Sequence, residues 1–117
     1  MNPFPRIFKA FIYSAAGLWH AVRNETAFAQ ELVLAAIFIP LALFLDVSIL
    51  AKILMICSII FILIMELINS AVEAVVDRIS TERHPLSKQA KDMGSAIVLL
   101  AFLQAGVIWF GVLLLGA

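Results

Sequence analysis

The sequence is almost without cysteine. Cys57 is the only cysteine among 117 residues, and it lies in the middle of an apolar run. A disulfide framework or a thiolate metal cluster needs several cysteines within reach of one another. Both are therefore excluded within a single chain, and Cys57 is interpreted as a packing or lipid-facing residue.

Charge is also scarce, and neither sign predominates. Charged residues make up 14% of the sequence, and eight basic residues balance eight acidic ones. A protein that binds nucleic acid by neutralising phosphates needs an excess of Lys and Arg. We therefore expect no nucleic-acid partner.

Glycine-rich phosphate-binding motifs are missing as well. The five glycines are spaced neither as a Walker loop nor as a dinucleotide-binding fingerprint. His20 and His84 have no partner at metal-ligand spacing. Any nucleotide site in this chain must therefore be built outside the familiar nucleotide-binding folds.

Hydrophobic residues dominate what is present. They account for 64% of the chain, against about half in an ordinary soluble domain. Runs long enough to cross a bilayer lie at residues 28–46, 49–68 and 91–117. The sequence therefore predicts one all-α, integral membrane domain over residues 1–117 with three transmembrane helices. Three spans are too few to enclose a large site, so we expect an oligomeric helical bundle.

Residues 4–24 precede the first span and show a helical periodicity. At 100° per residue, the apolar side chains from Phe4 to Val22 fall on one side, and Arg6 and Lys9 fall on the other. This pattern is typical of an amphipathic helix on a membrane surface, with Trp19 at headgroup depth. The alternative is a core helix of a soluble protein.

The basic residues are distributed unevenly around the spans. Seven of the eight lie before the first span or between the second and the third, and only Lys52 follows the first span closely. Basic residues concentrate on the cytoplasmic side of membrane proteins. We therefore expect the end of the second span to face the cytoplasm, continued by an extension at 69–79 and a loop at 80–90.

Polar residues near the end of the second span form one stripe. Glu66, Asn69, Ser70, Glu73 and Asp77 fall within about 100° of one another on a helix. Carboxylates so close together repel unless a cation intervenes, and Mg²⁺ commonly takes one or two of them. Glu25 is placed to supply another. The alternative is a solvated helix end, where Glu73 and Asp77 pair with nearby Arg or Lys.

The third span begins with features that suit a phosphate. Pro85 interrupts the preceding helix, and Ser87 is expected to cap the next one. Lys91 and Asp92 are expected at the start of that helix, where free N–H groups and the positive dipole end favour anions. Together with the carboxylates, these residues make a nucleoside triphosphate site plausible.

Two segments carry a resemblance to a known family. Glu66-x-x-Asn69-Ser70-Ala71-x-Glu73-x-x-x-Asp77 and Ala90-Lys91-Asp92-Met93-Gly94-Ser95-Ala96 closely resemble the bacterial integral-membrane diacylglycerol kinases, a family that includes undecaprenol kinases. The likeness covers nearly the whole chain, including Asn24-Glu25 and the three-span layout.

The resemblance implies a homotrimeric, multi-pass enzyme of the bacterial inner membrane with shared active sites on the cytoplasmic side. Such an enzyme uses MgATP to phosphorylate diacylglycerol to phosphatidic acid. By match of motif, Glu66 is the general base, and Glu25 and Glu73 hold Mg²⁺. The matched nucleotide-binding residues are Arg6, Tyr13, Glu25, Glu73, Glu82, His84, Lys91 and Asp92. The matched substrate-binding and site-lining residues are Glu66, Asn69, Asp77 and Ser95.

Three other functions are weighed against this interpretation. Undecaprenol kinases tend to have Asn-Thr where this chain has Asn69-Ser70, so the serine favours diacylglycerol. A non-catalytic membrane subunit could use the acidic stripe as a cation site. A proton- or ion-coupled transporter component could place carboxylates along its path.

Overall fold

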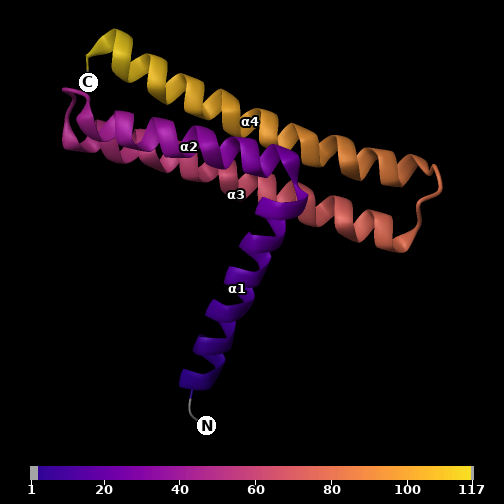
Figure 1. Ribbon diagram of the computed structural model, residues 1–117. Helices are drawn as coiled ribbons and strands as arrows, with labels where there is room; N and C mark the ends of the chain where they lie inside the picture. The colour runs from indigo at the N-terminus through magenta and orange to yellow at the C-terminus, as the bar shows by residue number, and fades with distance from the viewer. Residues whose placement is uncertain (1–2, 117) are drawn as a thin grey trace.

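The computed structural model describes residues 3–116 and shows four α-helices. They are α1 (Phe4–Asn24), α2 (Thr26–Phe44), α3 (Ile49–Ile79) and α4 (Pro85–Leu115). Helices α2, α3 and α4 lie side by side in an elongated bundle, and α1 leaves it at a steep angle (Figure 1). All three bundle helices are long and apolar enough to cross a membrane, which confirms the predicted fold class. Ala117, the last residue of the expected third span, lies outside the described residues.

Helix α1 has the amphipathic character that its sequence predicts. Pro5 lies in the first turn, where its missing N–H costs no hydrogen bond. Only Ala21 is buried, while Phe8 and Phe11 are exposed. The Arg23 guanidinium lies over the Trp19 ring, 5.6 Å from its centroid. Its position on a membrane surface stays a prediction.

A single residue, Glu25, joins α1 to α2. Its backbone is extended, with φ −111° and ψ 102°. Its N–H donates to the Ala21 carbonyl at 2.9 Å, and its own carbonyl accepts from the Ala29 N–H at 3.1 Å. Both backbone groups are therefore used by the two helices that meet there.

Residues 45–48 turn the chain from α2 into α3. The Ser48 hydroxyl accepts a hydrogen bond from the Ala51 N–H at 3.1 Å, which is the usual N-cap contact. The Lys52 ammonium donates to the Leu43 carbonyl at 2.7 Å and so satisfies a group at the end of α2. These contacts close the end of the bundle that is opposite the acidic stripe.

Small residues allow the bundle helices to approach closely. The buried positions include Ala35 and Ala42 on α2, Ala51 on α3, and Ala101 and Ala105 on α4. In a membrane, close backbone contact of this kind takes the place of the hydrophobic effect between helices. Ala101 and Ala105 of α4 pack against Ile62 of α3.

One polar contact crosses between α3 and α4 within the apolar region. The Trp109 indole N–H donates to the Ser58 hydroxyl at 3.0 Å, and that hydroxyl donates to the Met55 carbonyl at 2.6 Å. Phe38 of α2 packs edge-on against the Trp109 ring, with 5.4 Å between the two ring centroids. Trp109 therefore links all three bundle helices.

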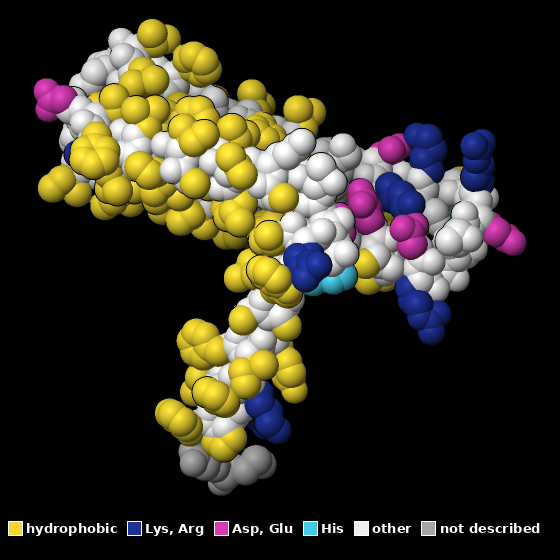
Figure 2. Space-filling view, viewed as in Figure 1, with side chains coloured by type: hydrophobic (Ala, Val, Ile, Leu, Met, Phe, Trp, Pro, Cys, Tyr) yellow, Lys and Arg dark blue, Asp and Glu magenta, His cyan; other side chains and the backbone are white. Residues whose placement is uncertain are grey.

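Helix α3 is longer than a bilayer core requires. Its 31 residues span about 46 Å at 1.5 Å per residue, against about 30 Å of hydrocarbon. The excess lies at its C-terminal end, where basic and acidic side chains gather on α3, α4 and their connection (Figure 2). The expected extension at 69–79 is thus a direct continuation of the same helix.

The expected start of the last helix is wrong. Helix α4 begins at Pro85, so the loop covers only 80–84 and residues 85–90 are helical. The N-cap is His84 rather than Ser87, because the His84 Nδ1 accepts from the Leu86 N–H at 3.1 Å. Proline at the first helical position favours this start, since its ring presets φ and no N–H is lost.

Candidate functional site

The acidic stripe on α3 is graded from buried to exposed. Glu66 is only 6% exposed, Asn69 and Glu73 are half-buried, and Asp77 is exposed. Exposure increases from Glu66 to Asp77 because α3 runs from the interior of the bundle to the end of the molecule. The stripe therefore connects the apolar interior to the solvated end of the molecule.

Glu66 is surrounded by other acidic and amide groups. Glu31 of α2 and Asn69 of α3 lie within hydrogen-bonding reach of its carboxyl group. The charges of Glu25 and Glu73 also act on it. We call Glu25, Glu31, Glu66, Asn69 and Glu73 the carboxyl cluster.

Asn69 is held in place by a glycine on α4. A Cβ atom at Gly94 would collide with the Asn69 Oδ1, so only glycine allows this approach of the two helices. The Asn69 amide also donates weakly to Glu73 Oε1 at 3.5 Å. Its Oδ1 is buried, and no described residue donates a hydrogen bond to it. This oxygen is an unused acceptor inside the carboxyl cluster.

The carboxyl cluster fits a hard cation that is only partly coordinated by protein. Among residues 3–116, no group of three or more His, Cys, Asp or Glu side chains gathers tightly enough to hold a metal alone. Mg²⁺ commonly needs just one or two carboxylates when phosphate oxygens and water complete its shell. Glu25 and Glu73 would supply such oxygens, and the Asn69 Oδ1 would be a further one.

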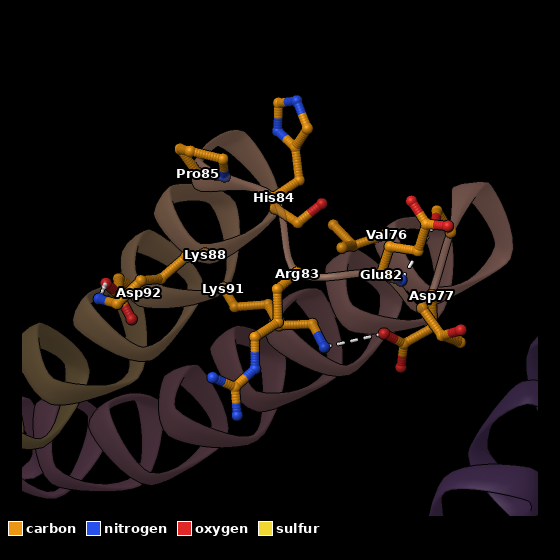
Figure 3. A pocket seen from close by; sticks show the side chains of 12 residues that line it. Val76, Asp77, Glu82, Arg83, His84, Pro85, Lys88, Lys91 and Asp92 are labelled. Atoms are coloured by element: carbon orange, nitrogen blue, oxygen red, sulfur yellow. Dashed lines mark hydrogen bonds and ion pairs between the residues drawn. The ribbon is translucent and has the colours of Figure 1, made fainter.

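A cleft of about 670 Å³ opens beyond the carboxyl cluster, between the end of α3 and the start of α4. It is lined by Val76, Asp77, Ser80, Thr81, Glu82, Arg83, His84, Pro85, Ser87, Lys88, Lys91 and Asp92. Figure 3 shows these side chains on the two helix ends and the connecting loop. Five of the sequence-predicted residues therefore meet here, namely Asp77, Glu82, His84, Lys91 and Asp92.

Two ion pairs lie across and beside the cleft. Lys91 Nζ of α4 lies 2.8 Å from Asp77 Oδ1 of α3, as the dashed line in Figure 3 marks. Lys88 Nζ lies 2.6 Å from Asp92 Oδ2, one helical turn along α4. The pairing that the solvated-helix alternative expects for Asp77 is therefore present. The charges of Glu73 and Lys91 also act on each other, which connects the cleft to the carboxyl cluster.

The expected position of Lys91 and Asp92 at a helix N-terminus is wrong. Because α4 begins at Pro85, Lys91 lies six residues inside it, about 9 Å along the axis. The positive end of the helix dipole lies at the loop side of the cleft instead. A phosphate near Lys91 would meet side-chain charge rather than free backbone N–H groups.

Three sequence-predicted residues lie outside both regions in the single chain. Arg6 and Tyr13 are exposed on α1 and do not line the cleft. Ser95 is exposed on α4, next to Gly94. Their predicted roles are untested by this arrangement.

Three charged residues of the two regions were missing from the sequence-predicted site. Arg83 and Lys88 line the cleft and were treated only as markers of orientation. Glu31 lies near the start of the first predicted span, 28–46, and has no predicted role. An ionisable residue inside an apolar run is a functional candidate by default, so this signal could have identified Glu31.

A second cavity of about 400 Å³ lies between the three bundle helices and has Glu31 at its border. The rest of its lining is apolar apart from the Trp109 indole N–H, and includes Phe38, Ile62 and Phe102. Glu31 therefore belongs both to the carboxyl cluster and to the lining of the apolar cavity.

Comparisons with known proteins agree with these features. A family model described as prokaryotic diacylglycerol kinase matches residues 12–113. The chain is 54% identical over 101 residues to a diacylglycerol kinase of Haemophilus influenzae, covering 86% of each chain. It is 51% identical over 109 residues to one of Pseudomonas aeruginosa, covering 93% of this chain and 89% of that one. It is 49% identical over 106 residues to one of Escherichia coli, covering 91% and 87%.

Proposed function

This chain belongs to the prokaryotic diacylglycerol kinase family, and from that premise we propose that it transfers the γ-phosphate of ATP to the free hydroxyl of diacylglycerol. The observation that carries the proposal is that α3 carries a buried carboxyl group and then continues to the border of a cleft that contains Lys and Arg. Glu66 is buried among the bundle helices, and Asp77 borders the cleft 11 residues later. That separation is about 16 Å along the axis.

In the proposed reaction, Glu66 is the general base. The diacylglycerol oxygen attacks the γ-phosphorus while its proton passes to the Glu66 carboxylate. The bond from the γ-phosphorus to the bridging oxygen of ADP breaks, so the products are phosphatidic acid and ADP. Phosphoryl transfer asks mainly for alignment and charge neutralisation, which suits a site without a reactive nucleophile of its own.

The cleft is the proposed nucleotide site. Lys91, Lys88 and Arg83 provide positive charge for phosphate oxygens, and His84 and Glu82 provide polar contacts at the loop. Glu25 and Glu73 would hold Mg²⁺, which neutralises the phosphate oxygens when it is bound. Binding of the phosphates requires Lys91 to exchange its contact with Asp77 for one with the nucleotide.

We also propose a homotrimer with shared sites. Arg6 and Tyr13 lie outside the cleft of their own chain, which is the arrangement expected if they complete the site of a neighbouring subunit. Cross-linking of purified protein in mild detergent tests the trimer.

The cleft side of the membrane is proposed to be cytoplasmic. This bacterial membrane protein carries seven of its eight basic residues on that side, which favours an inner-membrane protein with the cleft inside. Cysteines at Thr81 and Asp46 in a Cys57→Ala background test this. A membrane-impermeant thiol reagent added to intact cells stripped of their outer membrane should label position 46 and spare position 81.

The activity is tested by incubating purified protein with γ-labelled ATP and either diacylglycerol or undecaprenol. Labelled phosphate should enter diacylglycerol at a higher kcat/KM than undecaprenol. A preference for undecaprenol would make the chain an undecaprenol kinase. Absence of transfer to both lipids would favour a non-catalytic subunit or a transporter component.

A further inference from the structure

A hydrogen-bonded group in the apolar region joins α4 to α3, far from the cleft. The Trp109 indole nitrogen lies 3.0 Å from the Ser58 hydroxyl and 3.3 Å from the Met55 carbonyl oxygen. We propose that Trp109 is a positioning residue that fixes the register of α4 on α3, and so sets where Lys91 lies in the proposed nucleotide site. The consequence for catalysis rests on the proposed function, whereas the register itself does not.

The contact is directional, and each of its polar groups has a partner. An indole N–H can only donate, and the Ser58 hydroxyl accepts from it while donating to the Met55 carbonyl at 2.6 Å. Ser58 is buried, and the Trp109 ring packs against both apolar clusters of the bundle. If α4 slid along α3, the N–H would face apolar side chains, and an unpaired N–H away from water is costly.

The apolar packing between α3 and α4 is less selective. Ala101 and Ala105 are buried on α4, four residues apart, and both pack against Ile62. A slide of α4 by one turn would put one alanine in the place of the other, so the packing against Ile62 would change little. Small residues allow the two helices to approach closely, but this pair of alanines does not select one register.

The close approach at Gly94 is a second point that selects the register. Gly94 lies 15 residues before Trp109, about 22 Å along α4. A slide by one turn would bring Ala90 or Val98 toward Asn69, where a Cβ atom at the position of Gly94 already collides with the amide oxygen. The helix pair is therefore held in register by a steric contact next to the cleft and by a polar contact deep in the apolar region.

The polar contact matters because the cleft end of the pair must change on binding. Lys91 is held there by an exposed ion pair with Asp77, which is weak and has to open for the nucleotide phosphates. A slide by one turn would move Lys91 by about 5.4 Å, more than the length of a hydrogen bond. Trp109 lies 18 residues from Lys91 and outside the cleft, so its contact persists while the ion pair exchanges.

Cross-linking of the protein in lipid measures the register without ATP or lipid substrate. In a Cys57→Ala background, Asp77→Cys is combined with Lys91→Cys, or with Ser87→Cys or Ser95→Cys, one turn to either side on α4. A short bifunctional thiol reagent should join 77 to 91 within one chain several-fold faster than 77 to 87 or 95. Trp109→Phe keeps the ring and removes the N–H, so it should lower this preference about threefold, the usual contribution of one hydrogen bond between membrane helices.

Two further variants show whether the hydrogen bond is responsible. Ser58→Ala should lower the preference less than Trp109→Phe, because the Met55 carbonyl can still accept the indole N–H. The two substitutions together should match Trp109→Phe alone, since they remove the same bond. The control is Trp19→Phe, which changes the other tryptophan, exposed on α1, and should leave the preference unchanged.

The proposal is overturned if Trp109→Phe and Ser58→Ala both keep the parent preference, or if Trp19→Phe lowers it equally. Should Trp109→Phe fail to fold, the loss or retention of the preference in Ser58→Ala decides the question.

Kinetics test the consequence for the nucleotide site. Trp109→Phe should raise the KM for ATP by about 3- to 10-fold, with little change in the lipid KM, because Lys91 is no longer held in line with the phosphates. A fall in kcat with an unchanged KM for ATP would contradict a role in nucleotide positioning. Absence of phosphate transfer by the unsubstituted protein would instead contradict the proposed function and leave the cross-linking result standing.

Discussion

The two regions of the candidate site both include residues of α3 but balance their charges differently. The carboxyl cluster is buried at Glu66 and half-buried elsewhere, and it gathers four carboxyl groups without a cation among the described residues. The cleft is open and contains three Lys or Arg residues and three carboxylates, two of each joined as exposed ion pairs. The carboxyl cluster therefore requires a positively charged species from outside to neutralise it. In the cleft, the charges of the side chains neutralise one another.

The difference follows from hydration. Exposed ion pairs are weak because water competes for both partners, so a ligand can exchange with them at little cost. A carboxyl group in a poorly hydrated place keeps its few contacts, because losing them would leave it without hydrogen bonds at a large cost in free energy. The cleft is thus suited to reversible nucleotide binding, and the carboxyl cluster is suited to a fixed chemical role.

The largest expected effect comes from removing the buried base. Glu66→Gln should lower kcat at least about a hundredfold, the usual loss for a general base. MgATP binding, measured by displacement of a fluorescent nucleotide, should persist because the cleft and the two metal carboxylates are unchanged. Near-normal kcat with a raised lipid KM would make Glu66 a substrate-binding residue and move the search for a base to Asp77 or Asp92.

Variants that each remove one carboxylate charge can distinguish the loss of a metal ligand from the simple loss of a charge. Glu73→Gln and Glu25→Gln should each raise the Mg²⁺ concentration for half-maximal activity by at least about tenfold, or abolish activity, because a metal ligand is lost. Asp46→Asn removes the same charge at the far end of the bundle and should leave the Mg²⁺ dependence unchanged. If all three variants behave alike, Glu25 and Glu73 are not metal ligands.

Gly94 of α4 lies directly against the side chain of Asn69, which belongs to the carboxyl cluster. Gly94→Ala places a methyl group against the Asn69 amide, and overpacking of this kind typically costs about 1–3 kcal/mol. Thermal unfolding in detergent should show the loss, together with reduced kcat. Gly111→Ala is the control on the same helix, because a Cβ there meets no atom within 4 Å. That variant should be as stable as the parent or more stable. Equal behaviour of the two variants would contradict the close approach at Asn69.

The smallest effect is expected from an exposed pair in the cleft. Asp77→Asn removes the partner of Lys91 and should change thermal stability hardly at all. If Asp77 only competes with phosphate for Lys91, the Kd for ATP should fall a few-fold. Calorimetric titration with ATP measures it, and Lys91→Gln should raise the Kd in the same assay. A large loss of ATP affinity in Asp77→Asn would instead give Asp77 a direct role in nucleotide binding.

The helices and the stripe were predictable because they depend on local patterns. Apolar runs and a period of 3.6 residues identify the spanning helices and the amphipathic α1, and 100° per residue places Glu66 and Glu73 on one face. The start of α4 was mispredicted because Ser87 is the preferred residue type for a cap, while the actual cap is a histidine next to Pro85. Cap preferences rank residue types, but in this chain the position of Pro85 determines where α4 begins.

The contacts between helices were beyond the reach of the sequence. Glu31 meets Glu66 only because α2 packs on α3 in one particular register, and no spacing within either helix encodes that meeting. The same holds for Lys91 and Asp77, which lie on α4 and α3. Motif resemblance identified Lys91 and Asp77 as site residues, but their mutual contact appears only in three dimensions.

The unbroken length of α3 makes the chain sensitive to insertions in a way that point substitutions do not reveal. In the proposed reaction, the helix between Glu66 and Asp77 is a rigid spacer between a lipid-soluble and a water-soluble reactant. One extra residue in that interval would rotate everything beyond it by about 100° and advance it by about 1.5 Å. Glu73 and Asp77 would then leave the face they share with Glu66. Insertions in the 80–84 loop leave this register intact, so the two segments should differ sharply in the length changes they accept.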